Sequence, residues 1–285
     1  MTLAARDVIW KTGVLLVLWG AVFTPVIPDM VETWLNHSDS SHALLVPLIS
    51  LFFAWQKRQE LSRVEISTSL WGGLLLAVSL GVYLVSYAGG IAVFARMMIV
   101  TSLFGLLWGS LGWSAVRVLA FPLGFLMFMV PVPDTLLNMV SFPLQLLATR
   151  ISAEVIQFSS IPVYRDGNML YFVQTQLEVA EACSGIRSIM SLTMLSVLFA
   201  HLSGNGWWRK AILILAAVPI AMLANILRVS GTGILAHFFG DLVARGFLHE
   251  FSGLAVFAFG LGMLFLTFTL LNRIGVRRAP APIDR

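Results

Sequence analysis

Long apolar runs separated by short polar stretches dominate the pattern of this chain. A helix that crosses the hydrocarbon core of a bilayer needs about 20 mostly apolar residues. Runs of this kind predict eight spans, over residues 10–28, 42–56, 69–87, 90–110, 114–130, 184–204, 210–231 and 248–271. The pattern therefore predicts an all-α integral membrane protein, a single domain over residues 1–285 with no further domain fused after the last span.

The longest stretch outside the expected spans, residues 131–182, mixes apolar and polar positions. Pro131 and Pro133 end the preceding helix, because proline lacks a backbone donor and restricts the residue before it. A helical rhythm over Leu136–Phe158 predicts interfacial helices that lie along the membrane. Asp166 and Gly167, between β-prone residues, predict a small β-hairpin. Because loops of this length usually carry function, the segment is a candidate part of the site.

Composition agrees with a membrane protein, since 58% of the residues are hydrophobic and only 11% are charged. The first apolar run follows Arg6 and Lys11 as a signal peptide would, but no small-residue cleavage pattern follows it, so we expect a retained first span. The sequence pI is about 9.6. The basic residues of the chain are nevertheless scattered at span ends and form no basic stripe. This distribution argues against nucleic acid as a partner.

The distribution of basic residues predicts the orientation of the chain. With the N-terminus in the cytoplasm, most of the 18 basic residues fall on the cytoplasmic side, as the positive-inside rule requires. They are Arg6, Lys11, Lys57, Arg58, Arg63, Arg117, Arg209, Lys210, Arg273, Arg277, Arg278 and Arg285. Eight spans return the C-terminus to the cytoplasm, and the segment 131–182 is then extracytoplasmic.

The only cysteine of the chain, Cys183, precedes the sixth expected span. The free N–H groups and the positive dipole at a helix N-terminus lower a thiol pKa and can stabilise an oxyanion. Arg187, one turn further, adds a positive charge. Cys183 is therefore a candidate nucleophile, and spacing alone leaves open the alternative that it is a small packing residue.

Polar groups enter the otherwise apolar seventh span at Asn225 and Arg228, which are three residues apart. An arginine within a span costs at least a few kcal/mol, so it must snorkel, pair or serve a site. We expect Gly231 and Gly233 to loosen the helix just beyond it. Arg228 would then lie near the outer surface, level with Cys183.

A general base is needed beside a nucleophilic thiol, and histidine is suited to this role near neutral pH. His201 falls near the cytoplasmic end of its span and is excluded. Spacing does not choose among His42, His237 and His249, which all fall on the outer side. His249 opens the eighth span, at the level expected for Cys183 and Arg228.

Three segments together resemble the exosortase and archaeosortase family of multi-span membrane enzymes. Glu181–Ser188 is similar to the cysteine motif of that family, Asn225–Arg228 to its arginine motif and His249–Gly253 to its histidine motif. Further similar segments are Ser41–Pro47, Phe121–Pro133, Ile161–Val163 and Gly167-Asn168. One departure is Ala43, where the family pattern has glycine, and it weakens a role for the neighbouring His42.

The resemblance implies a cysteine protease or transpeptidase in which Cys183, Arg228 and His249 are catalytic. Support or substrate binding is expected from Glu181, Ser184, Gly185, Arg187, Asn225, His42 and Asn168. The expected substrates are secreted proteins that end in a short motif, one membrane-spanning helix and a basic tail. The expected location is the inner, cytoplasmic membrane among its lipids, with the site on the outer face and with no metal or organic cofactor.

Two other classes of protein remain possible from the sequence. A transporter or permease would use the buried Arg228 and a glycine-broken seventh helix as its substrate site. A membrane acyl- or glycan-handling enzyme would use the outer histidines on a lipid-linked substrate. Neither class requires the thiol of Cys183 for its activity. Dependence of the activity on Cys183 therefore distinguishes the protease from both alternatives.

Overall fold

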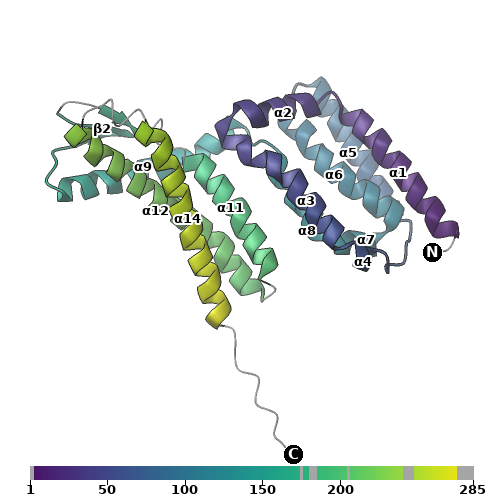
Figure 1. The fold of residues 1–285 in the computed structure, drawn as a ribbon. Coiled ribbons are helices and arrows are strands. Elements are labelled where there is room, and N and C mark those ends of the chain that lie inside the picture. The colour runs from purple at the N-terminus through teal and green to yellow at the C-terminus, as the bar shows by residue number, and fades with distance from the viewer. Residues whose placement is uncertain (1–2, 174–175, 180–184, 204–205, 240–246, 275–285) are drawn as a thin grey trace, which may run out of the picture. The chain divides into compact units, whose positions relative to one another are not determined.

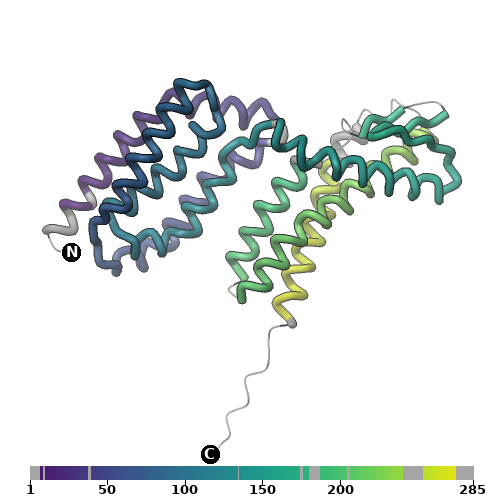
Figure 2. The backbone as a smooth tube through the Cα atoms, turned by 180° about the vertical axis from the view of Figure 1, so that it is seen from behind, coloured from purple at the N-terminus to yellow at the C-terminus, as the bar shows by residue number. Residues whose placement is uncertain are grey.

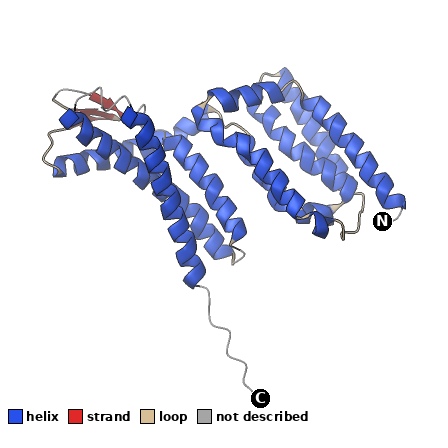
Figure 3. Cartoon of the chain, in the orientation of Figure 1, coloured by secondary structure: helices blue, strands red, loops and turns tan. Residues whose placement is uncertain are grey.

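The computed structural model describes residues 3–173, 176–179, 185–203, 206–239 and 247–274 of the chain. Helices make up most of the described chain, and the strands form one small sheet (Figure 3). The chain folds as two compact units, Met1–Pro133 and Asp134–Arg285. The ribbon in Figure 1 and the backbone tube in Figure 2 show the elements of both units.

The regular elements described in the first unit are all helices, joined by short turns and loops. Its elements are α1 (Leu3–Phe23), α2 (Ile27–Asn36), η1 (Ser38–Leu44), α3 (Leu45–Gln56), α4 (Arg58–Leu61), α5 (Leu70–Ala88), α6 (Ala92–Leu111), α7 (Trp113–Val118), α8 (Ala120–Phe125) and η2 (Leu126–Met129).

Glycines let α5 and α6 approach closely. A Cβ atom added to Gly72 would lie 2.1 Å from the backbone nitrogen of Gly109, and one added to Gly105 would lie 2.7 Å from the nitrogen of Leu76. Gly105 and Gly109 are four residues apart and share a helix face, the small-residue spacing that brings membrane helices together. The pair therefore packs backbone against backbone.

Polar side chains within the first unit join helices that are distant in sequence. The Trp19 indole donates to the Ser102 hydroxyl at 2.9 Å, and the Tyr83 hydroxyl donates to the Val22 carbonyl at 3.1 Å. The Ser50 hydroxyl donates to the carbonyl of Pro122 at 2.7 Å. These bonds satisfy groups that an apolar surrounding would otherwise penalise.

Two of the expected spans are interrupted by breaks that the apolar pattern does not reveal. The span expected over residues 10–28 bends by 67° between Trp10–Phe23 and Ile27–Asn36, close to Pro25, because proline cannot continue the hydrogen-bond ladder. The span expected over residues 114–130 consists of the short helices α7, α8 and η2.

Length and composition qualify five described helices to cross a membrane, or six if the bent pair is one span. The multi-pass membrane class is therefore supported, whereas the expected count of eight is not confirmed. Three helices expected as spans have only 10–17 residues in the structure and do not pass the length test for a span, namely Ser40–Gln56, Ala120–Met129 and Arg187–Leu202.

The described part of the second unit contains four long helices and the sheet. Its described elements are α9 (Asp134–Phe158), β1 (Tyr164–Asp166), β2 (Met169–Tyr171), β3 (Gln176–Glu178), α11 (Gly185–Leu202), α12 (Trp207–Phe239) and α14 (Phe247–Ile274). The segment Leu136–Phe158 is helical as expected, but it belongs to one continuous helix, α9, that includes Pro143. By length and composition, α9 also qualifies as a span.

The expected hairpin is confirmed, with its turn one residue later than predicted. Asp166 pairs with Met169, so Gly167 and Asn168 form the two-residue turn, and Gly167 has the positive φ of 56° that such turns require. The third strand, β3, was not predicted; it pairs antiparallel with β2 and completes the order β1-β2-β3.

The sheet packs on the C-terminal part of α12 and on α9. Leu170 of β2, Ile156 of α9 and Val229 of α12 are fully buried in one apolar cluster. A Cβ atom added to Gly233 would lie 2.8 Å from the Cδ1 atom of Ile156 and 2.9 Å from the Cζ atom of Phe172. Val229, beside Arg228, is thus fixed by the packing of three elements.

The helices α11, α12 and α14 lie side by side (Figures 1 and 2). α12 is continuous from Trp207 to Phe239, so the expectation that Gly231 and Gly233 loosen it is wrong. At Gly233 the missing side chain gives room to the packing neighbours on α9 and the sheet. At its start, Trp207 and Trp208 are exposed, and the Arg209 guanidinium lies 5.1 Å from the centre of a Trp208 ring.

Candidate functional site

Arg228 is buried within the second unit, with 7% of its surface exposed. It lies in α12, and its guanidinium faces the backbone of α14. A Cβ atom added to Gly253 would lie 3.7 Å from a terminal nitrogen of Arg228. The arginine motif and the glycine that closes the histidine motif therefore meet directly.

His249 lies in the first turn of α14, which begins at Phe247. It precedes Gly253 by four residues, and residues four apart share a helix face. The backbone thus presents the His249 position on the face of α14 that contacts Arg228. The side chain of His249 lies outside the described residues.

α11 and α14 bring a third motif segment to the same level. Both helices start at the same end of the three-helix group and run in the same direction (Figure 1). A Cβ atom added to Gly260 would lie 2.9 Å from Leu192, which fixes the register between them. Seven residues earlier on each helix are Gly185 and Gly253, so Gly185 lies near the level of Arg228. Glu181, Cys183 and Ser184 precede it and lie outside the described residues.

The remaining expected site residues occupy several elements. Arg187 is half-buried in the first turn of α11. Asn168 is half-buried in the β1–β2 turn, and its carbonyl accepts a hydrogen bond from Val179 at 2.9 Å. His42 lies in η1 of the first unit. His237 follows Arg228 by nine residues on α12, about 14 Å further along the helix and on its opposite side.

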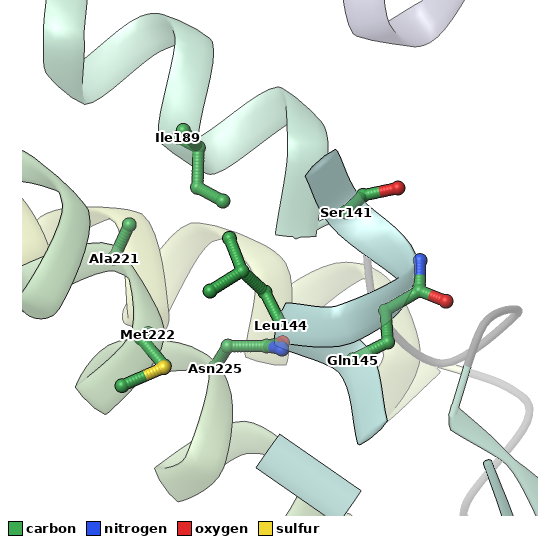
Figure 4. A pocket seen from close by; sticks show the side chains of 7 residues that line it. All are labelled: Ser141, Leu144, Gln145, Ile189, Ala221, Met222 and Asn225. Atoms are coloured by element: carbon green, nitrogen blue, oxygen red, sulfur yellow. The ribbon is translucent and has the colours of Figure 1, made fainter. Parts of the chain in front are cut away.

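Asn225 is buried one turn before Arg228 and lines a pocket between α9, α11 and α12. The pocket volume is about 20 Å³, enough for one water-sized group. Figure 4 shows the Asn225 amide directed from α12 toward Leu144 and Gln145 of α9. The lining residues are Ser141, Leu144, Gln145, Ile189, Ala221, Met222 and Asn225, and we call this site the α9 pocket.

Sequence reasoning did not single out Ser141 and Gln145. They are four residues apart on α9 and project from the same side of it (Figure 4). Their spacing is visible in the sequence, but the pocket that they line together with Asn225, some eighty residues away, depends on how α9 packs against α12.

The fold and this site define a multi-pass membrane protein with a buried arginine between two helices that carry distant sequence motifs. The profile of the transmembrane exosortases matches residues 34–266 of the chain, and the chain belongs to that family. Membership supports a role as a membrane transpeptidase or peptidase that sorts secreted proteins. No curated protein and no solved structure matches the chain.

Proposed function

We propose that this chain is a cysteine endopeptidase or transpeptidase that cleaves the C-terminal sorting signal of secreted proteins. Those signals are of the PEP-CTERM type, with a short motif, a membrane-spanning helix and a basic tail. The contact of Arg228 with Gly253 carries the proposal, because it joins two motifs of the family at one site. The level of Gly185, two residues after Cys183, supports the addition of the third motif.

In the proposed reaction, the imidazole of His249 takes the proton of Cys183, and the thiolate attacks the carbonyl of the scissile peptide bond. Arg228 stabilises the negative charge that develops on the oxygen. The C–N bond then breaks, the leaving amine takes the proton from the imidazolium, and a thioester remains.

The thioester is resolved by a second nucleophile. An acceptor amine, or water, attacks the thioester carbonyl and loses its proton through His249 to the departing Cys183 sulfur. An amine acceptor completes a transpeptidation, whereas water completes a hydrolysis. In both cases the thiol is restored and the acyl group leaves with the acceptor.

The proposed setting is the cytoplasmic membrane, with both termini in the cytoplasm and the site on the outer face. The orientation rests on the basic residues of the loops, such as Arg63, which is exposed. A substrate helix that descends from the outer face would present its preceding peptide bond at the level of Arg228.

The test is co-expression of the chain with a signal-bearing substrate, followed by mass spectrometry of the new C-terminus of the product. Cys183→Ala should reduce processing by roughly 10³-fold or more, because the nucleophile is removed. Leu84→Ala, at an exposed position of α5, is the matched control and should process like the wild type.

Processing by Cys183→Ala at the wild-type rate, with equal protein in the membrane, would overturn the cysteine mechanism. With the wild type, a free carboxylate on the product identifies hydrolysis. An added mass identifies transfer and gives the mass of the acceptor.

A further inference from the structure

Two arginine guanidinium groups at one end of the first unit lie over tryptophan rings. The Cζ atom of Arg58, in α4, is 4.1 Å from the centre of a Trp55 ring, and that of Arg117, in α7, is 5.8 Å from the centre of a Trp113 ring. All four residues are exposed, and we call them the Trp–Arg edge. A guanidinium that contacts a ring through its face keeps N–H groups in its plane for other acceptors.

Tertiary packing brings the two halves of the Trp–Arg edge together. α4 and α7 are in contact at one end of the first unit (Figure 1), where Leu61 of α4 packs against the buried cluster that contains Val116 of α7. The backbone N–H of Ser67 donates to the Leu111 carbonyl at 3.3 Å, which ties the segment after α4 to the end of α6. The edge is therefore built by the fold rather than by one helix.

The Trp–Arg edge carries an excess of positive charge. Within the described part of the chain, neither Arg58 nor Arg117 forms an ion pair; Arg58 donates to the Trp55 carbonyl at 3.1 Å. The segments 57–65 and 113–118 contain four basic residues and two acidic ones. An anionic group is therefore complementary to the edge.

An exposed apolar stripe on α3 leads to this charge. Leu48, Phe52 and Trp55 are spaced by four and three residues, so they share a helix face, and each is more than half exposed. Arg58 follows Trp55 by three residues at the end of the stripe. A ligand that fits both features has an apolar chain that ends in an anionic group.

We propose that the Trp–Arg edge binds anionic phospholipids, with an acyl chain along the α3 stripe and phosphodiester oxygens on the guanidinium groups of Arg58 and Arg117. The excess of positive charge favours a lipid of net negative charge over a zwitterionic lipid. This inference goes beyond the proposed function, because it assigns a partner to the first unit and does not involve the reaction.

The proposed orientation agrees with this partner, because it assigns the edge to the cytoplasmic side, where the membrane surface is negative. A further cation–π pair, Arg209 over Trp208, lies at the start of α12 in the second unit, on the same side in that orientation. The helix of the proposed substrate fits the edge less well, since its basic tail has the same sign of charge as the arginines.

Native mass spectrometry of the purified full chain, with equimolar dioleoyl-phosphatidylglycerol and dioleoyl-phosphatidylcholine, measures the preference. The wild type should retain phosphatidylglycerol preferentially. Arg58→Gln and Arg117→Gln should each lower this preference roughly fivefold, the factor expected for one arginine beside an anionic lipid surface. Arg165→Gln is the matched control, because it removes the same charge from an exposed position of β1, and it should keep the preference.

Three results of this measurement would overturn the inference. They are equal retention of the two lipids by the wild type, an unchanged preference in both edge variants, and an equal loss in Arg165→Gln, which would show a general effect of charge. Inorganic phosphate at the concentration of the lipid should not displace it. Displacement would show a site for the anion alone and would overturn the assignment to a lipid.

Photocrosslinking in membranes tests the occupant without any change to the arginines. With Phe52 replaced by p-benzoylphenylalanine, irradiation should give adducts of the mass of a phospholipid. A crosslink to a substrate, to a second copy of the chain or to the second unit would identify a different cover for the α3 stripe and overturn the inference. Both measurements are made without turnover, so their outcome is distinguishable from failure of the proposed function.

Discussion

The described part of the candidate site contains one buried cation, Arg228, which lies within α12. The positive charge of a guanidinium within a membrane helix costs free energy unless it is paired or serves a site. In this chain the Arg228 guanidinium lies against α14 at Gly253, which has no side chain. The guanidinium lies beside the second turn of α14, where a large side chain at residue 253 would occupy its place. The identity of residue 253 should therefore matter more than its distance in sequence from residue 228 suggests.

Substitution of Gly253 tests this dependence at the scale of a single residue. Gly253→Ala places its Cβ atom at an ordinary contact distance, 3.7 Å from the guanidinium, so processing should stay within about threefold of wild type, because no group at the site has to move. Gly253→Leu should push Arg228 aside and reduce processing roughly 10²-fold, as displacement of a catalytic group does. Equal activity of both variants would contradict this account.

At the scale of elements, close packing of α5 on α6 depends on which face of a helix bears glycine. Gly72 faces the backbone of Gly109, whereas a Cβ atom at the adjacent Gly73 would meet nothing within 4 Å. The two glycines have the same intrinsic cost in a helix. Their different surroundings therefore separate packing from helix propensity.

Gly72→Ala should lower the stability of the chain by about 1–3 kcal/mol, because the new methyl group would overlap a backbone that cannot yield. Gly73→Ala should leave stability unchanged or raise it by up to about 1 kcal/mol. The thermal unfolding midpoint of the purified chain in detergent measures both. A larger loss for Gly73→Ala than for Gly72→Ala would refute the packing.

The sequence predicted most helices correctly, since apolar runs such as those of α5 and α6 determine helix type regardless of partners. It did not predict where helices break. Pro25 marks one bend, but the sequence does not show whether a proline bends a span or is accommodated, as Pro219 is within α12. The hairpin turn was predicted from local turn chemistry at Gly167, whereas β3 depends on pairing across the sheet.

The candidate site was predictable only as far as its motifs. Arg228 stood out because a charge in an apolar run is costly. Its approach to Gly253 agrees with the expectation that the segments Asn225–Arg228 and His249–Gly253 belong to one site. The roles of Cys183 and His249 remain predictions. The α9 pocket was not predicted, because nothing local to Ser141 indicates that α12 will cover it.

For the whole molecule, the proposed orientation rests on the basic residues of the loops. Lys57, Arg58 and Arg63 lie in or beside α4, between α3 and α5. We therefore propose, from the positive-inside rule, that this loop is cytoplasmic. The same orientation assigns the β1–β2 hairpin to the outer side, although hairpin residues such as Arg165 carry charge as well.

Thiol labelling tests this orientation in the Cys183→Ala background. A membrane-impermeant maleimide added to sealed cells should label Asp166→Cys, in β1, and leave Arg63→Cys unlabelled until the membrane is permeabilised, because the bilayer excludes the charged reagent. Both positions are exposed, so accessibility within the protein does not limit the reaction. The reverse pattern would invert the assigned topology.

The uninterrupted course of α12 has a physical consequence for the enzyme's dependence on its lipids. From the tryptophans at its start to Arg228 the helix rises about 32 Å, close to the hydrocarbon thickness of a typical bilayer. If the exposed rings of Trp207 and Trp208 lie at one interface, as the proposed orientation implies, a thinner or thicker bilayer would tilt the helix or deform around it. In the proposed orientation, acyl-chain length in the host membrane would therefore set how far the guanidinium stands from the opposite headgroups.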